Sequence, residues 1–375
     1  MLKATLLAVG MTAAAISPPA FAQRHETHRM IPKLDHVFMI MMENHSYGEI
    51  IGNSNTPFIN QLAQNANLAT NYFAVGHPSL TNYLEVVGGS NFGIVNDNYP
   101  DWHNATSSAN LNKSIAGTGT DVATAAAIAP FGVAIPAATF KGVTIADQLV
   151  QAHMTWKTYQ ESLPMNGMID GVNYSDGIYS NLSDATITTT GYIQKLYAVK
   201  HNPFAYFANI QKNTSPWNGY NNMADFSGLK GLYADLRSDK VANFSFIAPN
   251  QCHDMHGIGN GSPLCNDDDT KLQMGDTAVK QIIVNIKASK AWKHGHNAIV
   301  LLWDENDFSN SPNQVVTIVD TNYGVHGLQS SHPYSHFSML KTLETGFGLP
   351  CLNHACDGNV KLMKDMFAIS KHQED

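Results

Sequence analysis

A continuous apolar run that ends in polar groups constrains the fold more than any other feature of the sequence. Residues 34–42 (LDHVFMIMM) lack the apolar–polar alternation of a strand with one wet face, and they lead directly into Glu43, Asn44 and His45. Such a run is typical of a strand buried on both faces, as in parallel sheets that are covered by helices. The sequence therefore predicts an interior strand whose carboxyl end carries polar side chains.

Two later segments show the same pattern, at residues 243–250 (NFSFIAPN) and 297–307 (NAIVLLWDEND). The segment between them has the period of a helix with one apolar face. Its apolar positions are Val279, Ile282, Ile283 and Ile286. A strand–helix–strand order is the connection that parallel strands require, so the sequence predicts an α/β fold with a mainly parallel sheet.

The middle of the chain is less regular. Residues 143–161 predict a helix followed by a strand, with Ile145, Leu149 and Ala152 on the buried face. Residues 104–141 are rich in Ala, Thr, Ser and Gly and offer few large side chains to a core, which predicts a surface excursion. With 375 residues of which 43% are hydrophobic, the chain has material for a large core, in one large domain or in two.

The charge of the chain argues against one class of partner. The formal net charge is −8, and Lys and Arg do not cluster, which disfavours binding to nucleic acid. A small phosphorylated ligand would instead need a local positive site.

The first residues predict export. Residues 1–22 contain Lys3, a short apolar run and Ala20-Phe21-Ala22, the A-x-A form of a secretory cleavage site. The run is too short for a stable membrane span, and we expect cleavage after Ala22 and a periplasmic or secreted protein.

The chain contains four cysteines, and an even count in an exported protein favours pairing. Local pairing, Cys252 with Cys265 and Cys351 with Cys356, is the simplest of three connectivities, with four free thiols as the alternative.

Polar side chains follow each of the three predicted strands. They are Glu43 and Asn44 after the first, Asn250, His253, Asp254 and His256 after the second, and Asp304 and Glu305 after the third. Each group alone could be a turn or a helix cap, but the carboxyl ends of parallel strands meet at one edge, where ligands bind.

Residues 76–89 (GHPSLTNYLEVVGG) predict a helix that has Pro78 in its first turn and stops at Gly88 and Gly89. Ser79 would then lie at the helix N-terminus, which favours an anion such as a phosphoryl group or the serine alkoxide. The alternative is that Ser79 only caps the helix.

Two further segments contain candidate site residues with a weaker sequence signal. His336 precedes a predicted helix within residues 330–344, and His332 competes with it for any role. The acidic run 267–269 is expected to be solvated surface that leads into the helix of 276–288 rather than a metal site.

Together these pieces resemble the bacterial phosphoesterases that include secreted acid phosphatases, phosphatidylinositol-3-phosphatases and phospholipases C, within the alkaline phosphatase superfamily. The matching pieces, in the order of the family, are MMENHSYGEIIG, GHPSLTNYLEVVGG, KHNPFAYF, APNQCHDMHG, LLWDEND and SHFSMLKTLE. The resemblance implies a three-layer α/β/α sandwich with a mainly parallel central sheet, formed by residues 23–375 as a single catalytic domain.

By this resemblance Ser79 is the nucleophile. The first metal would be held by Glu43, Asn44, Asp304 and Glu305, with Ser79 as a further ligand. Asn82, one helical turn after the serine, would help to hold the phosphoryl oxygens. Thr81 replaces a proline that is usual in the superfamily.

The resemblance also implies a second cluster, with His256 and His336 as catalytic residues. Its members would be Asn250, His253, Asp254, His256 and His336. They would bind a second metal, although Asn250 stands where an aspartate is common, or the histidines would bind phosphate directly. Lys200 and His201, with His253, are further candidates for the substrate pocket, an ordinary surface role for Lys200 and His201 being the alternative.

The ligand types indicate the metal. An all-oxygen first site favours Mg²⁺, Mn²⁺ or Ca²⁺, whereas the histidine-rich second cluster would accept zinc or no metal. If protonated histidines bind the phosphate, binding should weaken as they lose their protons above about pH 6.5. The enzyme would then have an acid pH optimum.

The expected function is an exported acid phosphatase that hydrolyses phosphate monoesters, including phosphoinositides or other phospholipid head groups, through a metal-activated Ser79 and a phosphoseryl intermediate. One alternative is a phospholipase C-type phosphodiesterase, which the short tail after His336 disfavours. The other is a non-catalytic exported phosphate-binding protein.

Overall fold

The computed structural model describes residues 31–93, 97, 142–163, 196–211, 215–238, 240–258, 265–308 and 312–369. The predicted export segment (1–22) and the predicted surface excursion (104–141) lie outside these residues.

A mixed, mainly parallel sheet forms the centre of the molecule. Its strands are β1 (His36–Met42), β2 (Asn67–Ala69), β4 (Trp156–Gln160), β5 (Met223–Ala224), β6 (Phe244–Ala248), β7 (Asn297–Trp303), β8 (Thr317–Thr321) and β9 (Gln329–Ser330). The order is β5-β4-β6-β1-β7-β8-β2-β9, and only β8 runs antiparallel to its neighbours in this sheet. A small sheet pairs β3 (Tyr72–Phe73) with β10 (Tyr334–Ser335).

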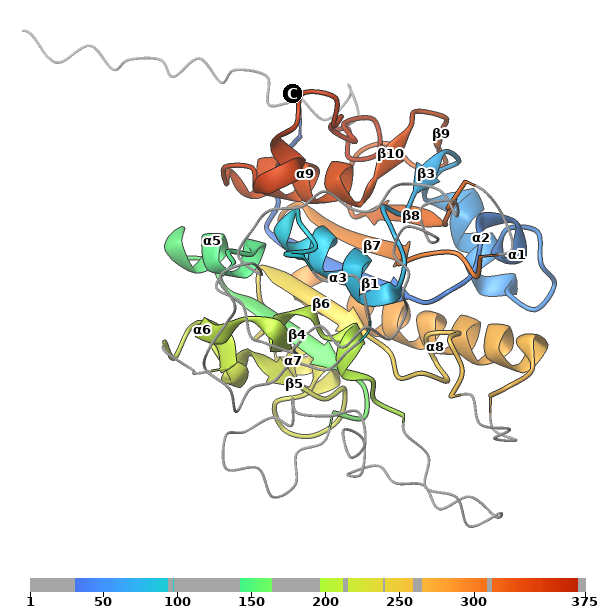
Figure 1. Cartoon of the computed structure of the whole chain (residues 1–375), viewed down its shortest axis with the longest axis horizontal. Coiled ribbons are helices and arrows are strands. Elements are labelled where there is room, and N and C mark those ends of the chain that lie inside the picture. Colours follow the sequence, from blue (N-terminus) through green and yellow to red (C-terminus); the bar gives the residue numbers. More distant parts are fainter. Residues whose placement is uncertain are drawn as a thin grey trace, which may run out of the picture.

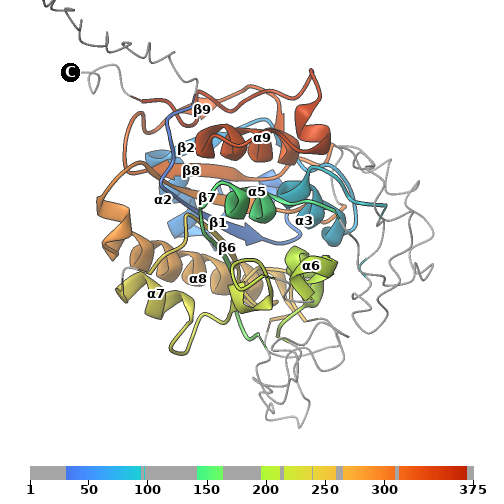
Figure 2. The same ribbon diagram turned by 90° about the vertical axis from the view of Figure 1, so that its left-hand side faces the viewer.

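Helices cover both faces of the central sheet. They are α1 (Tyr47–Ile50), α2 (Pro57–Asn65), α3 (Ser79–Gly88), α5 (Ile145–Gln151), α6 (Ala208–Gln211), α7 (Leu232–Ser238), α8 (Asp268–Ala288) and α9 (His336–Phe347). Helices α3, α5 and α9 contact one another on one face, and α2 and α7 contact α8 on the other (Figures 1 and 2). The three-layer α/β/α arrangement predicted from the sequence is confirmed.

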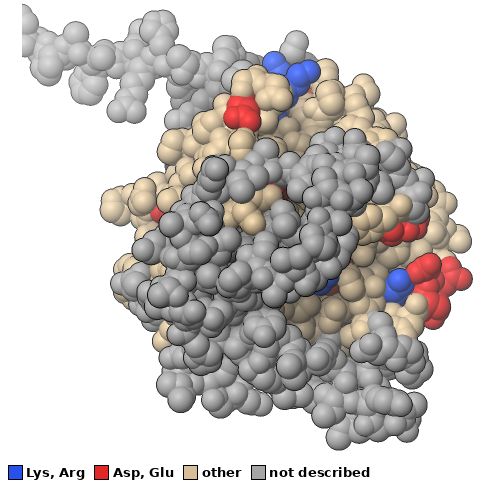
Figure 3. Space-filling model, in the orientation of Figure 1, with Lys and Arg blue, Asp and Glu red and all other residues tan. Residues whose placement is uncertain are grey.

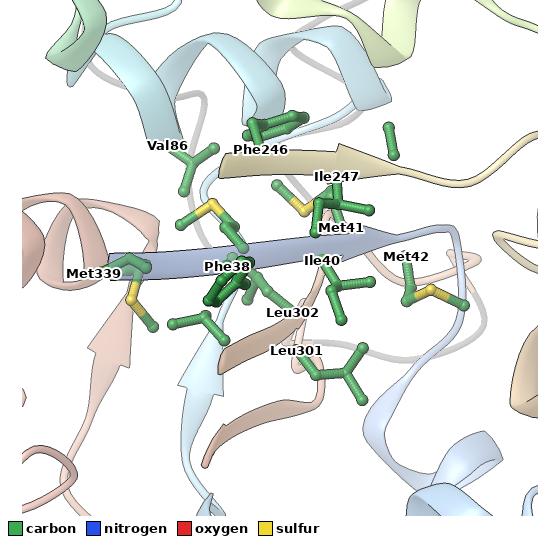
Figure 4. Close-up of a cluster of buried hydrophobic side chains, with 14 of the residues drawn as sticks. Phe38, Ile40, Met41, Met42, Val86, Phe246, Ile247, Leu301, Leu302 and Met339 are labelled. Carbon is green, nitrogen blue, oxygen red and sulfur yellow. The ribbon is translucent and has the colours of Figure 1, made fainter. Parts of the chain in front are cut away.

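Strand β1 is the middle of the core. It lies between β6 and β7, so the connection from β6 through α8 to β7 passes over β1. Its apolar side chains point to both faces, as Figure 4 shows for Phe38, Ile40 and Met41. Residues 37–42 have no exposed surface, and burying a side chain of this size contributes about 1.5–3 kcal/mol. The continuous apolar run is therefore the signature of an interior strand, as predicted.

Helix α8 begins earlier than the sequence period indicates. The Asp267 carboxylate accepts a hydrogen bond from the Thr270 backbone N–H at 2.9 Å, and Asp268 and Asp269 occupy the first turn. Carboxylates there satisfy free N–H groups and the positive end of the helix dipole. The acidic run therefore leads into the helix, as expected, but the helix starts at residue 268 rather than 276.

The ends of α3 and α5 refine two local predictions. Pro78 precedes α3 as its N-cap instead of lying in the first turn, and Gly89 ends the helix with φ +68°. A Cβ at Gly89 would lie 2.4 Å from the Leu352 carbonyl oxygen, so only glycine fits. In α5, Ile145 is buried, but Ala152 is an exposed C-cap and its predicted burial is wrong because the chain turns towards β4 there.

Both predicted disulfides, Cys252–Cys265 and Cys351–Cys356, are present. Among the described residues, no helix has the length and apolarity needed to cross a bilayer. On the described part of the surface in Figure 3, the visible Lys and Arg side chains lie apart from one another.

Candidate active site

The loops that follow β1, β6 and β7 are tied to one another at the carboxyl edge of the sheet. The Glu43 N–H donates to the Asp254 carbonyl oxygen at 2.8 Å, and the Asp304 N–H donates to the Met42 carbonyl oxygen at 3.0 Å. The Asn44 N–H donates to Asp304 Oδ1 at 3.0 Å. The structure thus brings together polar groups that are far apart in the sequence and holds them on buried strands.

Ser79 lies at the centre of this edge, as the first residue of α3. Its hydroxyl lies within donating distance of two carboxylates, 3.1 Å from Glu43 Oε2 and 3.2 Å from Glu305 Oε1. The side chain is 1% exposed. A single hydroxyl with two acidic acceptors at the positive end of a helix is suited to losing its proton during a nucleophilic attack.

Asn82 holds the loop that leads into α3. Its Oδ1 accepts hydrogen bonds from the N–H groups of Val75 and Gly76, both at 3.1 Å. Its Nδ2 donates to the Gly76 carbonyl oxygen at 2.8 Å and to Glu305 Oε2 at 3.3 Å. The amide predicted to hold phosphoryl oxygens therefore shapes the loop before Ser79 and orients Glu305.

His77 is a member of the site that the sequence reading missed. Its Nδ1 lies 2.7 Å from Glu305 Oε2, and its ring stacks on Phe308 at a centroid distance of 3.8 Å. Burial lowers the pKa of His77 to about 4. A histidine two residues before Ser79 is a usable signal, but nothing in the sequence indicates that its ring turns to Glu305.

His201 bridges two carboxylates. Its Nε2 lies 3.1 Å from Glu43 Oε1 and its Nδ1 lies 3.1 Å from Asp254 Oδ2, while its ring stacks on Tyr83. Burial, reinforced by the charges of Lys200 and His256, lowers the pKa of His201. His201, predicted as a substrate residue, therefore joins the loops after β1 and β6.

The carboxyl groups of the site resist ionisation. Burial is the main cause of a raised pKa at Glu43, Asp254, Asp304 and Glu305. Negative neighbours raise these pKa values further: Asp304 acts on Glu43, and Glu305 acts on Asp304. The positive charge of Lys200 lowers each of the four pKa values but does not cancel the effect of burial.

Lys200 and His256 form the positive side of the site. The Lys200 Nζ lies 3.3 Å from His256 Nε2, and His256 Nδ1 lies 2.7 Å from the Gly257 carbonyl oxygen. Burial and the charge of Lys200 lower the pKa of His256 to about 4. Burial disfavours the charged Lys200, but Asp97 and Glu43 outweigh this and raise its pKa. The ammonium group, rather than an imidazolium at His256, is the cation here.

The remaining histidines of the predicted second cluster have separate partners. His336 is fully buried, with Nε2 2.6 Å from the Asp304 carbonyl oxygen and Nδ1 3.1 Å from the Tyr72 hydroxyl. Both of its ring nitrogens therefore have protein partners, and one of these contacts holds the backbone carbonyl of Asp304. Its competitor His332 is exposed.

His253 and Asn250 belong to a different neighbourhood. His253 Nδ1 lies 2.8 Å from Glu161 Oε2, and the Asn250 N–H donates to the same oxygen at 3.0 Å. The Asn250 amide also donates to Ser162 Oγ at 3.2 Å. Burial lowers the pKa of His253, but the hydrogen bond and charge of Glu161 prevail and raise it. His253, His256 and His336 therefore each have different hydrogen-bond partners.

The first predicted metal site passes a test on its donor atoms. Asn44 Oδ1 and Asp304 Oδ2 are buried and accept no hydrogen bond. Within the described ranges, no group of three or more His, Cys, Asp or Glu side chains is arranged to hold a metal ion. A site here therefore depends on the Asn44 amide and the Ser79 hydroxyl as well as on carboxylates, a set that suits a hard cation.

A cavity of about 330 Å³ lies beside the site, on the α8 face of the sheet. Its lining includes Glu161, His253, Tyr233 and Met274 but not Ser79. It adjoins the loop after β6 and is not the place where a group attached to Ser79 would lie.

A family model and several known proteins match most of this chain. The model of the family described as "Phosphoesterase family" matches residues 53–350. The chain is 27% identical to a phosphatidylinositol-3-phosphatase of Mycobacterium tuberculosis over 329 residues, which cover 87% of this chain and 81% of the relative. It is 25% identical to an acid phosphatase of Aspergillus fumigatus, over 86% of this chain and 57% of that longer protein.

Among solved structures, a protein of the alkaline phosphatase superfamily from Vibrio parahaemolyticus has a TM-score of 0.47 and 13% identity. The similarity covers 85% of this chain and 67% of that one.

Proposed function

Because this chain belongs to the phosphoesterase family, we propose that it hydrolyses phosphate monoesters in the manner of an acid phosphatase, with Ser79 as the nucleophile. Relatives named as acid phosphatases and a phosphatidylinositol-3-phosphatase support a phosphoric monoester hydrolase. The observation that carries the role of Ser79 is its position at the start of α3, between the carboxylates of Glu43 and Glu305.

In the first step the Ser79 oxygen forms a bond to phosphorus while the bond to the leaving oxygen breaks. The hydroxyl proton passes to the carboxyl group of Glu43 or Glu305, whichever is ionised, and the leaving alkoxide takes up a proton from water. In the second step water attacks the phosphoseryl group, which releases inorganic phosphate and restores the serine. His77 and Asn82 keep Glu305 in place through both steps.

The other requirement of this reaction is positive charge beside the negatively charged phosphoryl oxygens. The N-terminus of α3 and the Lys200 ammonium both bind the Asp97 carboxylate, and they would supply part of this charge. The side chains of Glu43, Asn44, Asp304 and Glu305, together with Ser79, would hold a divalent cation, with Mg²⁺, Mn²⁺ or Ca²⁺ favoured over Zn²⁺. Such a cation would polarise a phosphoryl oxygen and lower the pKa of the serine hydroxyl.

We extend the proposal to substrate and compartment. The relative named phosphatidylinositol-3-phosphatase supports phosphoinositides among the substrates. The A-x-A site within residues 1–22 and the two disulfides support an exported, periplasmic or secreted enzyme.

The test compares S79A with S227A. The Ser227 hydroxyl also donates to a carboxylate, Asp225 Oδ2 at 2.9 Å, but it is exposed and lies outside the site. With p-nitrophenyl phosphate we expect S79A to lose at least about a thousandfold in kcat and S227A to match the wild type. Acid quenching during turnover should trap a phosphoserine in the wild type and in S227A only.

Two outcomes would overturn parts of this proposal. Undiminished turnover by S79A would remove the assigned nucleophile, and no turnover by the wild type would favour a phosphate-binding protein. A preference for p-nitrophenylphosphorylcholine would identify a phosphodiesterase instead.

A further inference from the structure

Asp97 places a carboxylate beside the proposed nucleophile. Its Oδ1 accepts a hydrogen bond from the Leu80 backbone N–H at 3.0 Å, and its Oδ2 accepts one from Lys200 Nζ at 3.0 Å. Leu80 directly follows Ser79 in the first turn of α3. The two oxygens of one anion therefore bind the N–H group that follows the serine and an ammonium group.

The same pair of donors suits a phosphoryl group. An oxyanion at a helix N-terminus is stabilised by the N–H groups and by the dipole, and an ammonium group adds a charge-assisted hydrogen bond. A phosphorus atom attacked by the Ser79 oxygen holds its other oxygens within reach of the next N–H group along the helix, that of Leu80. The first-turn N–H of Thr81 is already bonded to the Pro78 carbonyl oxygen at 3.1 Å.

The surroundings of Asp97 support its place at the mouth of the site. Its side chain is 32% exposed and that of Lys200 is 16% exposed, whereas Ser79 is buried. The charge of Asp97 contributes to the raised pKa of Glu305, whose carboxylate lies 3.2 Å from the Ser79 hydroxyl. The carboxylate is thus close to the reacting oxygen and open to solvent.

We propose that Asp97 is an internal competitor of the substrate, and that its carboxylate occupies the phosphoryl subsite at the start of α3 until a phosphate monoester displaces it. This inference rests on the proposed function of Ser79. On binding, Leu80 N–H and Lys200 Nζ exchange the carboxylate for phosphoryl oxygens. Asp97 then weakens the binding of both substrate and inorganic phosphate and helps the product to leave.

A purely structural role for Asp97 predicts the opposite change in phosphate affinity when the carboxylate is removed. If the carboxylate only holds Lys200 ready for the substrate, its removal frees the lysine and weakens phosphate binding. The direction of one measured change therefore decides between the two roles.

The experiment measures inorganic phosphate as an inhibitor of p-nitrophenyl phosphate hydrolysis, and its binding by calorimetry, for the wild type, D97N and D97A. D97N removes the charge but keeps an oxygen that can accept from Leu80. Because the ion pair is partly exposed, we expect about a fivefold lower Ki for phosphate and a lower KM in D97N. D267N is the matched control, since it removes the charge of another carboxylate that accepts from a first-turn N–H, at α8, and should leave both constants unchanged.

An unchanged or higher Ki in D97N and D97A would overturn the inference, as would the failure of both variants to fold. Calorimetry separates this failure from that of the proposed function. If the wild type hydrolyses the ester but D97N does not bind phosphate more tightly, only the role of Asp97 is wrong. If no ester is hydrolysed, the reaction assigned to Ser79 is wrong, whatever the affinity for phosphate.

Discussion

A buried carboxyl group outside the active site gives a prediction that is independent of catalysis. Glu344 lies in α9 and is 1% exposed, and neither carboxyl oxygen has a hydrogen-bond partner. Burial raises the pKa of Glu344 to about 9. Burial outweighs the Leu352 backbone and the charge of Lys341, which both lower the pKa, so the folded protein keeps this group protonated up to about pH 9.

The sign of the effect follows from proton binding. Between the pKa of Glu344 in the unfolded chain, about 4.3, and its folded pKa of about 9, the folded state binds one proton more than the unfolded state. Stability is therefore fully present below about pH 4.3 and falls by about 1.4 kcal/mol per pH unit as the pH rises through this window. From pH 5 to pH 9 the ideal loss is about 5 kcal/mol, and local relaxation or entry of water would reduce it to about 2 to 5 kcal/mol.

The variant E344Q carries no ionisable group at this position and should not show this loss. Urea unfolding followed by tryptophan fluorescence, at pH 5, 6, 7, 8 and 9 with constant salt and a chelator, gives the difference in unfolding free energy from the wild type. We expect E344Q to gain on the wild type steadily with pH. E49Q is the control, because it makes the same Glu-to-Gln change at a carboxylate that has hydrogen-bond partners. The Glu49 carboxylate accepts from the Ser46 N–H and hydroxyl at 2.6 and 2.8 Å. A difference between E344Q and the wild type that stays constant with pH would refute the reasoning.

Two further predictions concern the site. Chelation should abolish hydrolysis of p-nitrophenyl phosphate, and Mg²⁺, Mn²⁺ or Ca²⁺ should restore it better than Zn²⁺, because the Glu43, Asn44 and Asp304 donors are oxygens; full activity in the chelator would exclude the metal. The pair C252A/C265A should lose about 3 kcal/mol of stability and much of kcat, since this bridge spans 13 residues and anchors the loop of Asp254 and His256. The pair C351A/C356A, with a separation of 5 residues and no site residue in its loop, should lose less of both; equal losses of kcat would contradict the anchoring role.

The half of the sheet that could be predicted from sequence is the half with long apolar strands. Strands β1, β6 and β7 are continuous apolar runs, and α8 shows the period of a helix packed on one face. The other half, with β8, β2 and β9, has no comparable signal because β2 is only three residues long. Its strands are defined by partners far away in the chain, as in the pairing of Leu68 with Ile318.

The site divides in the same way. Glu43, Asn44, Asp304 and Glu305 could be named because each directly follows a buried strand, whose end fixes where the side chain lies. His77 could not, because the loop before α3 sets its position, and Asp97 lies far from these strands in the sequence. Glu161 directly follows β4 and was open to the same argument, but its contact with His253 gives no signal in the sequence. The predicted second cluster illustrates the limit: its histidines are close together or conspicuous in the sequence, yet His253 turns to Glu161 and His336 turns beneath Asp304.

The four acidic side chains at the carboxyl edge of the sheet link metal binding to protonation. Glu43, Asp254, Asp304 and Glu305 are all buried, and each charge that forms makes the next less favourable. Lys200 is the cation that opposes this, since burial lowers the pKa of both His201 and His256. A divalent cation at the Asn44 and Asp304 oxygens would favour the ionised carboxylates, so metal uptake should release protons and strengthen as the pH rises. Phosphate binding gains instead from acid, because fewer of these four carboxyl groups are then charged and repel the anion. The optimum for turnover then falls where these two opposed demands on the same carboxyl cluster balance.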